Sequence, residues 1–246
     1  MIYRKLCIVS LLLAASVSLA QRKVDGLYSR RAYSLWEMLA GSNKPFIIPS
    51  PDRRSRVVAT YREDKDTHIL LNLTGELGSL QLDLEPGVGS ELLWAPDSKA
   101  LFVTSSDAGG NGSYHLYVVD TFEGKLQSRE LTGLIDHTFG HPVRCDPKGL
   151  FTEPPNVAGI GWVAQTHHIW VAAEIVAHSV CDSDGTFKAY EVDPASMTVV
   201  RTLDQLEAKR ELRQLLGNEL KGAPDQCIRN PKSCYVSTNH PELESK

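Results

Sequence analysis

The sequence predicts a mainly β protein made of antiparallel, blade-like repeats: a small or incomplete β-propeller with short N-terminal and C-terminal helices. The main observation is a block that occurs twice, at residues 94–131 and 162–203. Each copy runs from a Trp through a polar turn and an apolar strand to a loop, a strand ending in Tyr-x-Val-Asp, and a third strand. A weaker copy at residues 49–84 begins with Ser-Pro-Asp where the better copy has Ala-Pro-Asp. Predicted helices flank the repeats on both sides.

Residues 1–20 have the pattern of a secretory signal peptide. Arg4 and Lys5 precede an apolar run over residues 6–15, and the small residues Ser18 and Ala20 fit cleavage after Ala20. This run is too short to cross a bilayer, and no later run is long enough for a transmembrane segment. We therefore expect the chain to be secreted or periplasmic.

Cysteine content agrees with export, because removal of residues 1–20 leaves an even number, namely Cys145, Cys181, Cys227 and Cys234. In an oxidising compartment, four cysteines indicate two disulfides with three possible connectivities. We favour Cys227 with Cys234, which closes a short loop, and Cys145 with Cys181. The alternative of a zinc site lacks a Cys-x-x-Cys pair.

The charge of the chain gives no indication of nucleic-acid binding. The net charge is −4, and the sequence pI is about 6.1. The basic runs at residues 22–23, 30–31 and 53–54 are short and interleaved with acids, which predicts solvated surface. A hydrophobic fraction of 42% suits one domain with an ordinary core.

Residues 21–45 are predicted to form an N-terminal helical segment. Apolar residues at helical spacing between Ser29 and Gly41 indicate a short amphipathic helix, with Gly41 as its stop. This helix would lay Trp36 and Leu39 on the body of the domain.

Residues 46–203 are predicted to form the propeller-like β domain. Alternating or β-branched runs separated by turn residues predict its strands, at residues 57–61, 68–73, 80–84, 91–94, 100–105, 114–120, 169–176, 187–193 and 198–203. Pro-Asp at 96–97 predicts the tight turn of the best copy. Residues 134–161, which contain Pro, Gly and His, are predicted to be a long excursion on one face of the repeats.

Residues 204–246 are predicted to form a C-terminal helix and a disulfide-closed tail. Asp204 with Glu207 forms a capping-box pattern. The helix would run to Leu220 and end at Gly222 and Pro224. Its predicted apolar stripe consists of Ala208, Leu212, Leu215, Leu216 and Leu220.

The segments 94–105 and 115–120 resemble the blade motif of TolB-type, WD-repeat-like β-propellers. That family has Ser and Gly where this chain has Ala95 and Ser98. The resemblance implies a scaffold of four-stranded antiparallel blades, often periplasmic or extracellular, that binds proteins or other ligands across its faces. Propellers close with four to eight blades, whereas this chain shows three units. Three alternatives would account for the difference: a divergent unit within 134–161, an open stack capped by helices, or association of chains.

Histidines that lie close together in the sequence are the main candidates for ligand binding. His137 and His141 have i, i+4 spacing, but the glycine and proline at 140 and 142 argue against a helix and favour a loop pair over a metal site. His167 and His168 fall in a turn, where we expect one ring to pack against Trp162 or Trp170.

No cofactor is expected, with calcium or zinc as the alternatives. The segment 181–185 resembles the start of a calcium loop but lacks the downstream acid, so a hairpin turn is favoured. No nucleophile elbow, P-loop or dinucleotide fingerprint occurs, and no catalytic residue is assigned. Asp120 and Asp193 end equivalent strands, which indicates a structural role.

The hypothesis from the sequence is an exported, non-enzymatic module that binds a protein or a cell-envelope component. The alternative is a secreted hydrolase or metal-dependent enzyme that uses the histidine-containing loop. A third possibility is a structural subunit that completes its propeller by oligomerising.

Overall fold

The structure is a computed structural model that describes residues 26–40, 42, 44–63, 67–85, 87–107, 112, 114–139, 143–144, 152–176 and 186–223. The predicted signal peptide, the four cysteines with their two disulfides, the 181–185 segment and His141 lie outside the described residues. These predictions stay as stated above.

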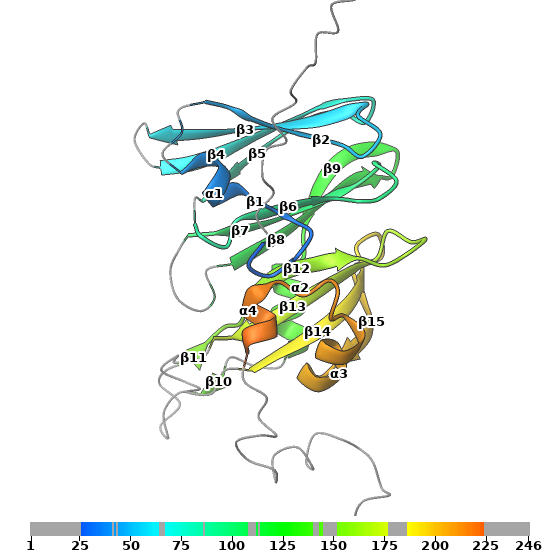
Figure 1. The fold of residues 1–246 in the computed structure, drawn as a ribbon. Coiled ribbons are helices and arrows are strands. Elements are labelled where there is room, and N and C mark those ends of the chain that lie inside the picture. Colours follow the sequence, from blue (N-terminus) through cyan, green and yellow to red (C-terminus); the bar gives the residue numbers. More distant parts are fainter. Residues whose placement is uncertain are drawn as a thin grey trace, which may run out of the picture.

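The protein is mainly β, with three antiparallel sheets that lie face to face in a stack (Figure 1). Sheet 1 consists of β2 (Phe46–Pro49), β3 (Ser55–Glu63), β4 (Thr67–Gly75) and β5 (Gly78–Leu84). Sheet 2 has the order β1 (Tyr33–Ser34), β6 (Glu91–Trp94), β7 (Leu101–Ser106), β8 (Tyr114–Phe122) and β9 (Lys125–Glu130). Sheet 3 consists of β12 (Asn156–Trp162), β13 (Ile169–Ile175), β14 (Thr186–Asp193) and β15 (Thr198–Leu203).

Four short helices and one small hairpin complete the described elements. The hairpin pairs β10 (Val143–Arg144) with β11 (Thr152–Glu153). The helices are α1 (Leu35–Leu39), α2 (Thr132–Phe139), α3 (Gln205–Glu211) and α4 (Asn218–Gly222). Within the described ranges, no helix has the length and apolar character needed to cross a membrane.

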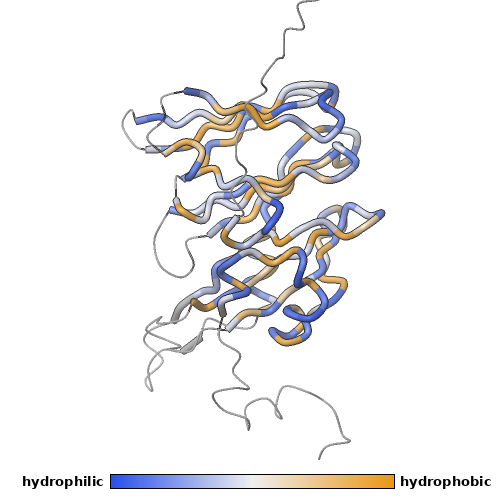
Figure 2. Tube along the Cα trace, viewed as in Figure 1, coloured by the Kyte–Doolittle hydropathy of each residue, from blue (hydrophilic) through white to orange (hydrophobic). Residues whose placement is uncertain are grey.

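Hydrophobic residues are frequent along the strands of the three sheets (Figure 2), and their buried side chains pack between neighbouring sheets. Val57 and Leu71 of sheet 1 belong to the same core as Val103 of sheet 2. On the other face of sheet 2, Phe102 packs in a second core with Val171 of sheet 3. Because sheet 2 is covered on both faces, all six residues of β7 are buried, and burial of this kind is the dominant favourable term in folding.

The far face of sheet 3 is covered by the C-terminal helices. Trp170 and Phe187 of this sheet share a third core with Leu212, Leu216 and Leu220. The far face of sheet 1 has no such cover in the described part of the chain, and Ile47 there is 53% exposed. The stack is therefore capped at one end.

The same tight turn joins the first two long strands of every sheet. In each turn the first residue donates its N–H to the carbonyl of the sixth, and the carbonyl of the first accepts from the fourth. The turns span residues 50–55, 95–100 and 163–168. Each contains one non-glycine residue with positive φ: Arg53 at 64°, Ser98 at 68° and Gln165 at 63°. The positive φ falls at the fourth residue of the first two turns and at the third residue of the last, which lacks the Pro-Asp pair but keeps both hydrogen bonds. The structural repeat is therefore more regular than the sequence repeat.

The repeated tryptophans join neighbouring sheets. Trp94 Nε1 donates to the Ile48 carbonyl at 3.4 Å, and Trp162 Nε1 donates to the Leu93 carbonyl at 3.3 Å. Ile48 and Leu93 stand at equivalent places, two residues before their turns. In sheet 1 the position of the tryptophan is taken by Pro49, which has no donor.

The N-terminal helix is shorter than the sequence predicts. The chain before it is not helical, because Tyr28 and Ser29 each donate a backbone N–H to the Glu91 carboxylate at 3.0 Å, residues 30–31 form a turn, and residues 33–34 pair with β6 as strand β1. The helix α1 starts only after Ser34, whose hydroxyl accepts from Glu37 N. Leu39 is buried as expected, whereas Trp36 is half-exposed.

The excursion predicted over residues 134–161 is corrected by the structure. Its beginning belongs to α2, which buries Ile135 in the core between sheets 2 and 3 and ends at Phe139, before the glycine and proline. Its end is β12, whose residues are all buried. The described parts of this segment thus supply the first strand of sheet 3 and the small β10–β11 hairpin.

The single C-terminal helix predicted to Leu220 is two helices. The capping box of Asp204 and Glu207 is confirmed at the start of α3. The chain then leaves the helix, because Gly217 N donates to Tyr28 O at 2.7 Å and Arg30 N donates to Leu215 O at 2.9 Å. The predicted apolar stripe still packs on sheet 3, although Leu215 is only partly buried.

Candidate functional site

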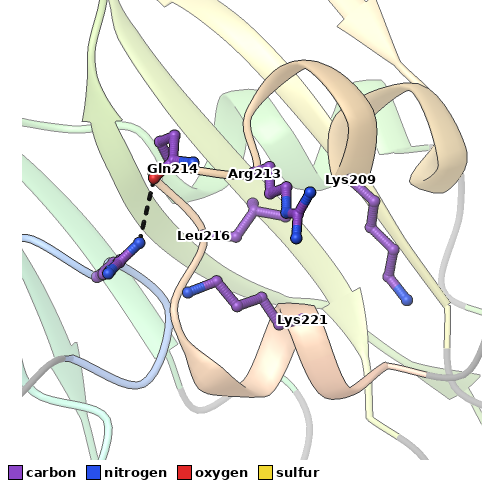
Figure 3. Close-up of a pocket in the computed structure, with 6 residues that line it drawn as sticks. Lys209, Arg213, Gln214, Leu216 and Lys221 are labelled. Carbon is purple, nitrogen blue, oxygen red and sulfur yellow. Dashed lines mark hydrogen bonds between the residues drawn. The ribbon is translucent and has the colours of Figure 1, made fainter.

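A cavity of about 570 Å³ lies where the N-terminal segment meets the C-terminal helices. The described residues that line it, here called the basic pocket, are Arg30, Lys209, Arg213, Gln214, Leu216 and Lys221 (Figure 3). Four of these six side chains are cations, and none of the six is acidic. The pocket is therefore a concentrated positive site on a chain whose net charge is −4.

Backbone pairing between distant segments places Arg30 in the pocket. Ser29 forms an antiparallel bridge with Leu216, so the N-terminal segment runs beside the turn between α3 and α4. The Arg30 side chain then reaches Gln214, to whose Oε1 its Nη1 donates at 3.2 Å. This contact joins residues that are far apart in the sequence.

The remaining cations come from the C-terminal elements. Lys209 extends from α3 and donates to the Ala223 carbonyl beyond α4, so it ties the two helices together. Arg213 belongs to the turn, and Lys221 belongs to α4 (Figure 3). In the described part of the chain, no hydrogen bond or ion pair joins the side chain of Arg213 or Lys221 to another residue, and both are exposed.

The base of the pocket is an apolar residue of the core. Leu216 is 1% exposed, and it belongs to the core that contains Leu212 and Leu220. Like charges that share one opening repel each other, and an anion placed among them relieves this repulsion. The arrangement is thus suited to hold a negatively charged group.

A second polar cluster surrounds His167 in the turn between β12 and β13. Its Nδ1 lies 2.6 Å from Asp120 Oδ2, and its Nε2 lies 2.9 Å from Asp97 Oδ2. A neutral imidazole can donate only one of these two hydrogen bonds, whereas an imidazolium can donate both, so the geometry favours the protonated ring. Burial acts to lower the pKa of His167, but the hydrogen bonds and charges of the two carboxylates outweigh it and raise this pKa.

The His167 cluster borders a cleft of about 330 Å³ at the tight-turn end of the stack. The described lining combines residues from all three sheets or their turns: Leu77, Lys99, Asp120, Thr121, Phe122, His167, Pro194 and Ala195. Both ring nitrogens of His167 are engaged by carboxylates, which lie on opposite sides of the ring. The cluster links sheets 2 and 3, and its members Asp120 and His167 also line the cleft.

The other predicted histidines are not brought together in one site. His168 Nδ1 bonds to Glu191 Oε1 at 2.8 Å, away from the partners of His167. His137 lies exposed on α2, where a loop was predicted, and His141 is outside the described residues. The prediction that a histidine ring packs on a neighbouring tryptophan is confirmed, since the rings of His167 and Trp162 lie 6.5 Å apart edge to face.

No metal centre is formed by the residues with described positions, where no group of three or more His, Cys, Asp or Glu has a suitable arrangement. The two strand-end aspartates have structural contacts. Asp120 accepts from Thr121 N at 2.6 Å in addition to binding His167. Asp193 accepts from Ala195 N at 2.8 Å.

Two buried carboxyl groups flank the N-terminal segment. Burial raises the pKa of Glu91 to about 7, although its hydrogen bonds from Ser29 and Tyr28 act in the opposite direction. Burial likewise raises the pKa of Glu174 to about 7, opposed by a hydrogen bond from the Tyr28 side chain. The Glu174 Oε2 atom has no hydrogen-bond partner in the described structure.

The cations of the basic pocket were not selected from the sequence, where Arg30 was assigned to solvated surface. One signal was available, because Lys209 and Arg213 are four residues apart in a predicted helix and would share a face. The approach of Arg30 depends on the pairing of Ser29 with Leu216, which no local pattern indicates.

Comparisons with known proteins add little to this description. No family model matches the chain, and no curated protein matches it. Among solved structures, an acylaminoacyl peptidase from Pyrococcus horikoshii is similar, with 8% sequence identity and a TM-score of 0.34. The match covers 61% of this chain and 23% of the peptidase chain.

Proposed function

We propose that this protein is an exported, non-enzymatic binding module that recognises another protein or a cell-envelope component. The observation that carries the proposal is the composition of the basic pocket. Four cations and an amide surround one opening, while the described lining contains no carboxylate, imidazole, thiol or hydroxyl group. Such a lining attracts and orients a charged partner but lacks the paired groups of most hydrolytic sites.

The residues repeated between the sheets support the same proposal. Trp94 and Trp162 use their indole N–H groups to bind the preceding sheet. Asp97 and Asp120 hold His167 across the junction between sheets 2 and 3. The side chains that stand out in the sequence therefore have contacts that join the sheets, which leaves the basic pocket as the candidate for recognition.

The scaffold that we propose is an open stack of three propeller-like blades, as the resemblance to TolB-type repeats implies. The capped face of sheet 3 and the proline at position 49, where the other sheets have their joining tryptophan, support an open stack over a closed ring. An open stack of this kind keeps the pocket beside its helical cap accessible.

Affinity capture from the native envelope and secreted fractions tests this function. The full chain, recovered as the cell processes it, is immobilised beside a variant in which Arg213→Gln and Lys221→Gln remove two pocket charges. We expect a partner that the unaltered protein retains, that high salt releases, and that the variant fails to retain. A partner retained equally by both proteins would contradict a role for the pocket, and a turnover abolished by one side-chain substitution would contradict the non-enzymatic proposal.

A further inference from the structure

We infer that the basic pocket binds a phosphate ester, carried either by a small soluble molecule or by a phospholipid headgroup. The inference rests on the proposed function as a binding module and deepens it by naming the ligand chemistry. Three observations support it: the number of cations, the hydrogen bonds that fix two of them, and the size of the cavity.

The charge of the pocket matches a group with more than one negative charge. Arg30 and Arg213 supply guanidinium groups, and Lys209 and Lys221 supply ammonium groups. A phosphate monoester carries a charge of about −1.5 to −2 near neutral pH and presents three acceptor oxygens. A carboxylate presents only two oxygens, so it satisfies fewer of these donors at once.

The cations fall into two pairs with different roles. Arg30 and Lys209 are anchored, since Arg30 Nη1 donates to Gln214 Oε1 and Lys209 Nζ donates to the Ala223 carbonyl. Arg213 and Lys221 are exposed and have no such bond to a described residue. The anchored pair shapes the opening in advance, which lowers the entropic cost of binding, and the second pair is available to contact the ligand.

The size of the cavity favours an ester over the bare ion. A volume of about 570 Å³ falls in the range of pockets that hold a complete small molecule. Because Leu216 is itself 1% exposed, the organic part of the ligand would pack against the aliphatic stems of the lining arginines and lysines. Guanidinium groups bind phosphate oxygens in a bidentate manner, so Arg213 is expected to be the main contact.

Calorimetric titration of the full chain with glycerol 3-phosphate tests the inference. We expect saturable binding that the uncharged analogue glycerol does not reproduce. Succinate, a dicarboxylate of similar charge, is expected to bind at least about tenfold more weakly. Succinate binding as tight as that of glycerol 3-phosphate would overturn the inference and indicate an acidic-peptide site instead.

Charge variants locate the binding. The double variant Arg213→Gln/Lys221→Gln is expected to weaken glycerol 3-phosphate binding by at least about tenfold. The matched control Arg56→Gln/Arg62→Gln removes two exposed charges from β3 in sheet 1 and is expected to change affinity less than about twofold. Equal losses in both variants, or none in the first, would overturn the inference. The charge-preserving variant Arg213→Lys/Lys221→Arg should retain most of the binding, which separates lost charge from damaged folding.

Vesicles distinguish the two sources of the phosphate group. Co-sedimentation with vesicles that contain phosphatidic acid, whose headgroup is a phosphate monoester, but not with phosphatidylcholine vesicles, supports a phospholipid headgroup if it is lost in the Arg213→Gln/Lys221→Gln variant. Binding of glycerol 3-phosphate without co-sedimentation supports a soluble ester.

Failure of the inference differs from failure of the proposed function. If an envelope partner is captured while glycerol 3-phosphate does not bind, the phosphate inference is overturned and the binding module remains. If glycerol 3-phosphate binds and is turned over, the phosphate site is supported and the non-enzymatic function is overturned.

Discussion

The indole N–H of Trp162 donates to the backbone carbonyl of Leu93 across the junction of sheets 2 and 3, at 3.3 Å. Trp94 makes the equivalent contact with Ile48 one junction earlier. The twofold occurrence of Trp in the sequence repeat is thus explained by a twofold occurrence of the same inter-sheet bond.

Replacement of either tryptophan should therefore loosen a junction. Trp162→Phe leaves the Leu93 carbonyl without its donor and reduces packing, and we expect the free energy of unfolding to fall by about 1–3 kcal/mol. Urea denaturation followed by circular dichroism measures the change. The control Trp36→Phe alters a half-exposed ring on α1 and should change stability by about 0.5 kcal/mol or less. Equal effects at the two positions would argue against the junction role.

His167 should make stability depend on pH. Its folded-state pKa is raised, so its contribution is fully present below the unfolded value of 6.5 and is lost as the pH rises through the folded value. Since 37% of its side chain is exposed, solvent screening reduces the size of this contribution.

The test for His167 compares the loss of stability in His167→Gln at about pH 6 and about pH 9. We expect the larger loss at the lower pH, where the imidazolium pairs with Asp97 and Asp120. The control His137→Gln, on the exposed side of α2, should show no such difference. A larger loss at the higher pH would have the wrong sign for an ion-paired imidazolium.

Glu174 should make the protein less stable as the pH rises, whereas an acid in a salt bridge makes a protein more stable. Its pKa is raised from 4.5 to about 7, so the folded state holds a proton that the unfolded state has released, and the free energy of unfolding falls as the pH rises between these values. Glu174→Gln keeps the shape but cannot ionise. We expect a shallower decline of stability from about pH 5 to about pH 8 in this variant, with Glu91 responsible for the remainder. An unchanged slope would contradict the raised pKa.

Gly217 should be required for the contact between the two ends of the described chain. A Cβ at this position would overlap the carbonyl of Leu27, so Gly217→Ala is expected to cost about 2 kcal/mol or more of stability. Gly133→Ala on α2 is the matched control, because nothing lies within 4 Å of its added Cβ. There the better helix propensity of alanine should leave stability unchanged or higher by up to about 1 kcal/mol. A tolerated Gly217→Ala would contradict the close packing of these segments.

The bounds of strands and helices are predicted well where they depend only on residues that are neighbours in the sequence. The strands at Glu91–Trp94 and Thr198–Leu203 have the bounds that their apolar patterning predicts. The capping box at Asp204 also fixes the start of α3 correctly, since its two hydrogen bonds involve only neighbouring residues.

Features that depend on distant contacts were missed. The helix at Thr132–Phe139 was rejected because of the glycine and proline that follow it, yet these residues lie beyond its end. The C-terminal helix is interrupted because the N-terminal segment takes up hydrogen bonds from Gly217 and Glu219. The same pairing brings Arg30 into the basic pocket, so this cation could not be grouped with the others from the sequence.

The most direct test of the central claim is to map, by two-dimensional ¹H–¹⁵N NMR on the full chain, which amides shift when glycerol 3-phosphate is added. A phosphate-binding pocket at the helical cap predicts saturable shifts at Arg30, Arg213, Gln214 and Lys221, with the strands of sheet 1 unchanged. Shifts confined to the cleft around His167, or no saturable shift near Arg213 and Lys221, would contradict it.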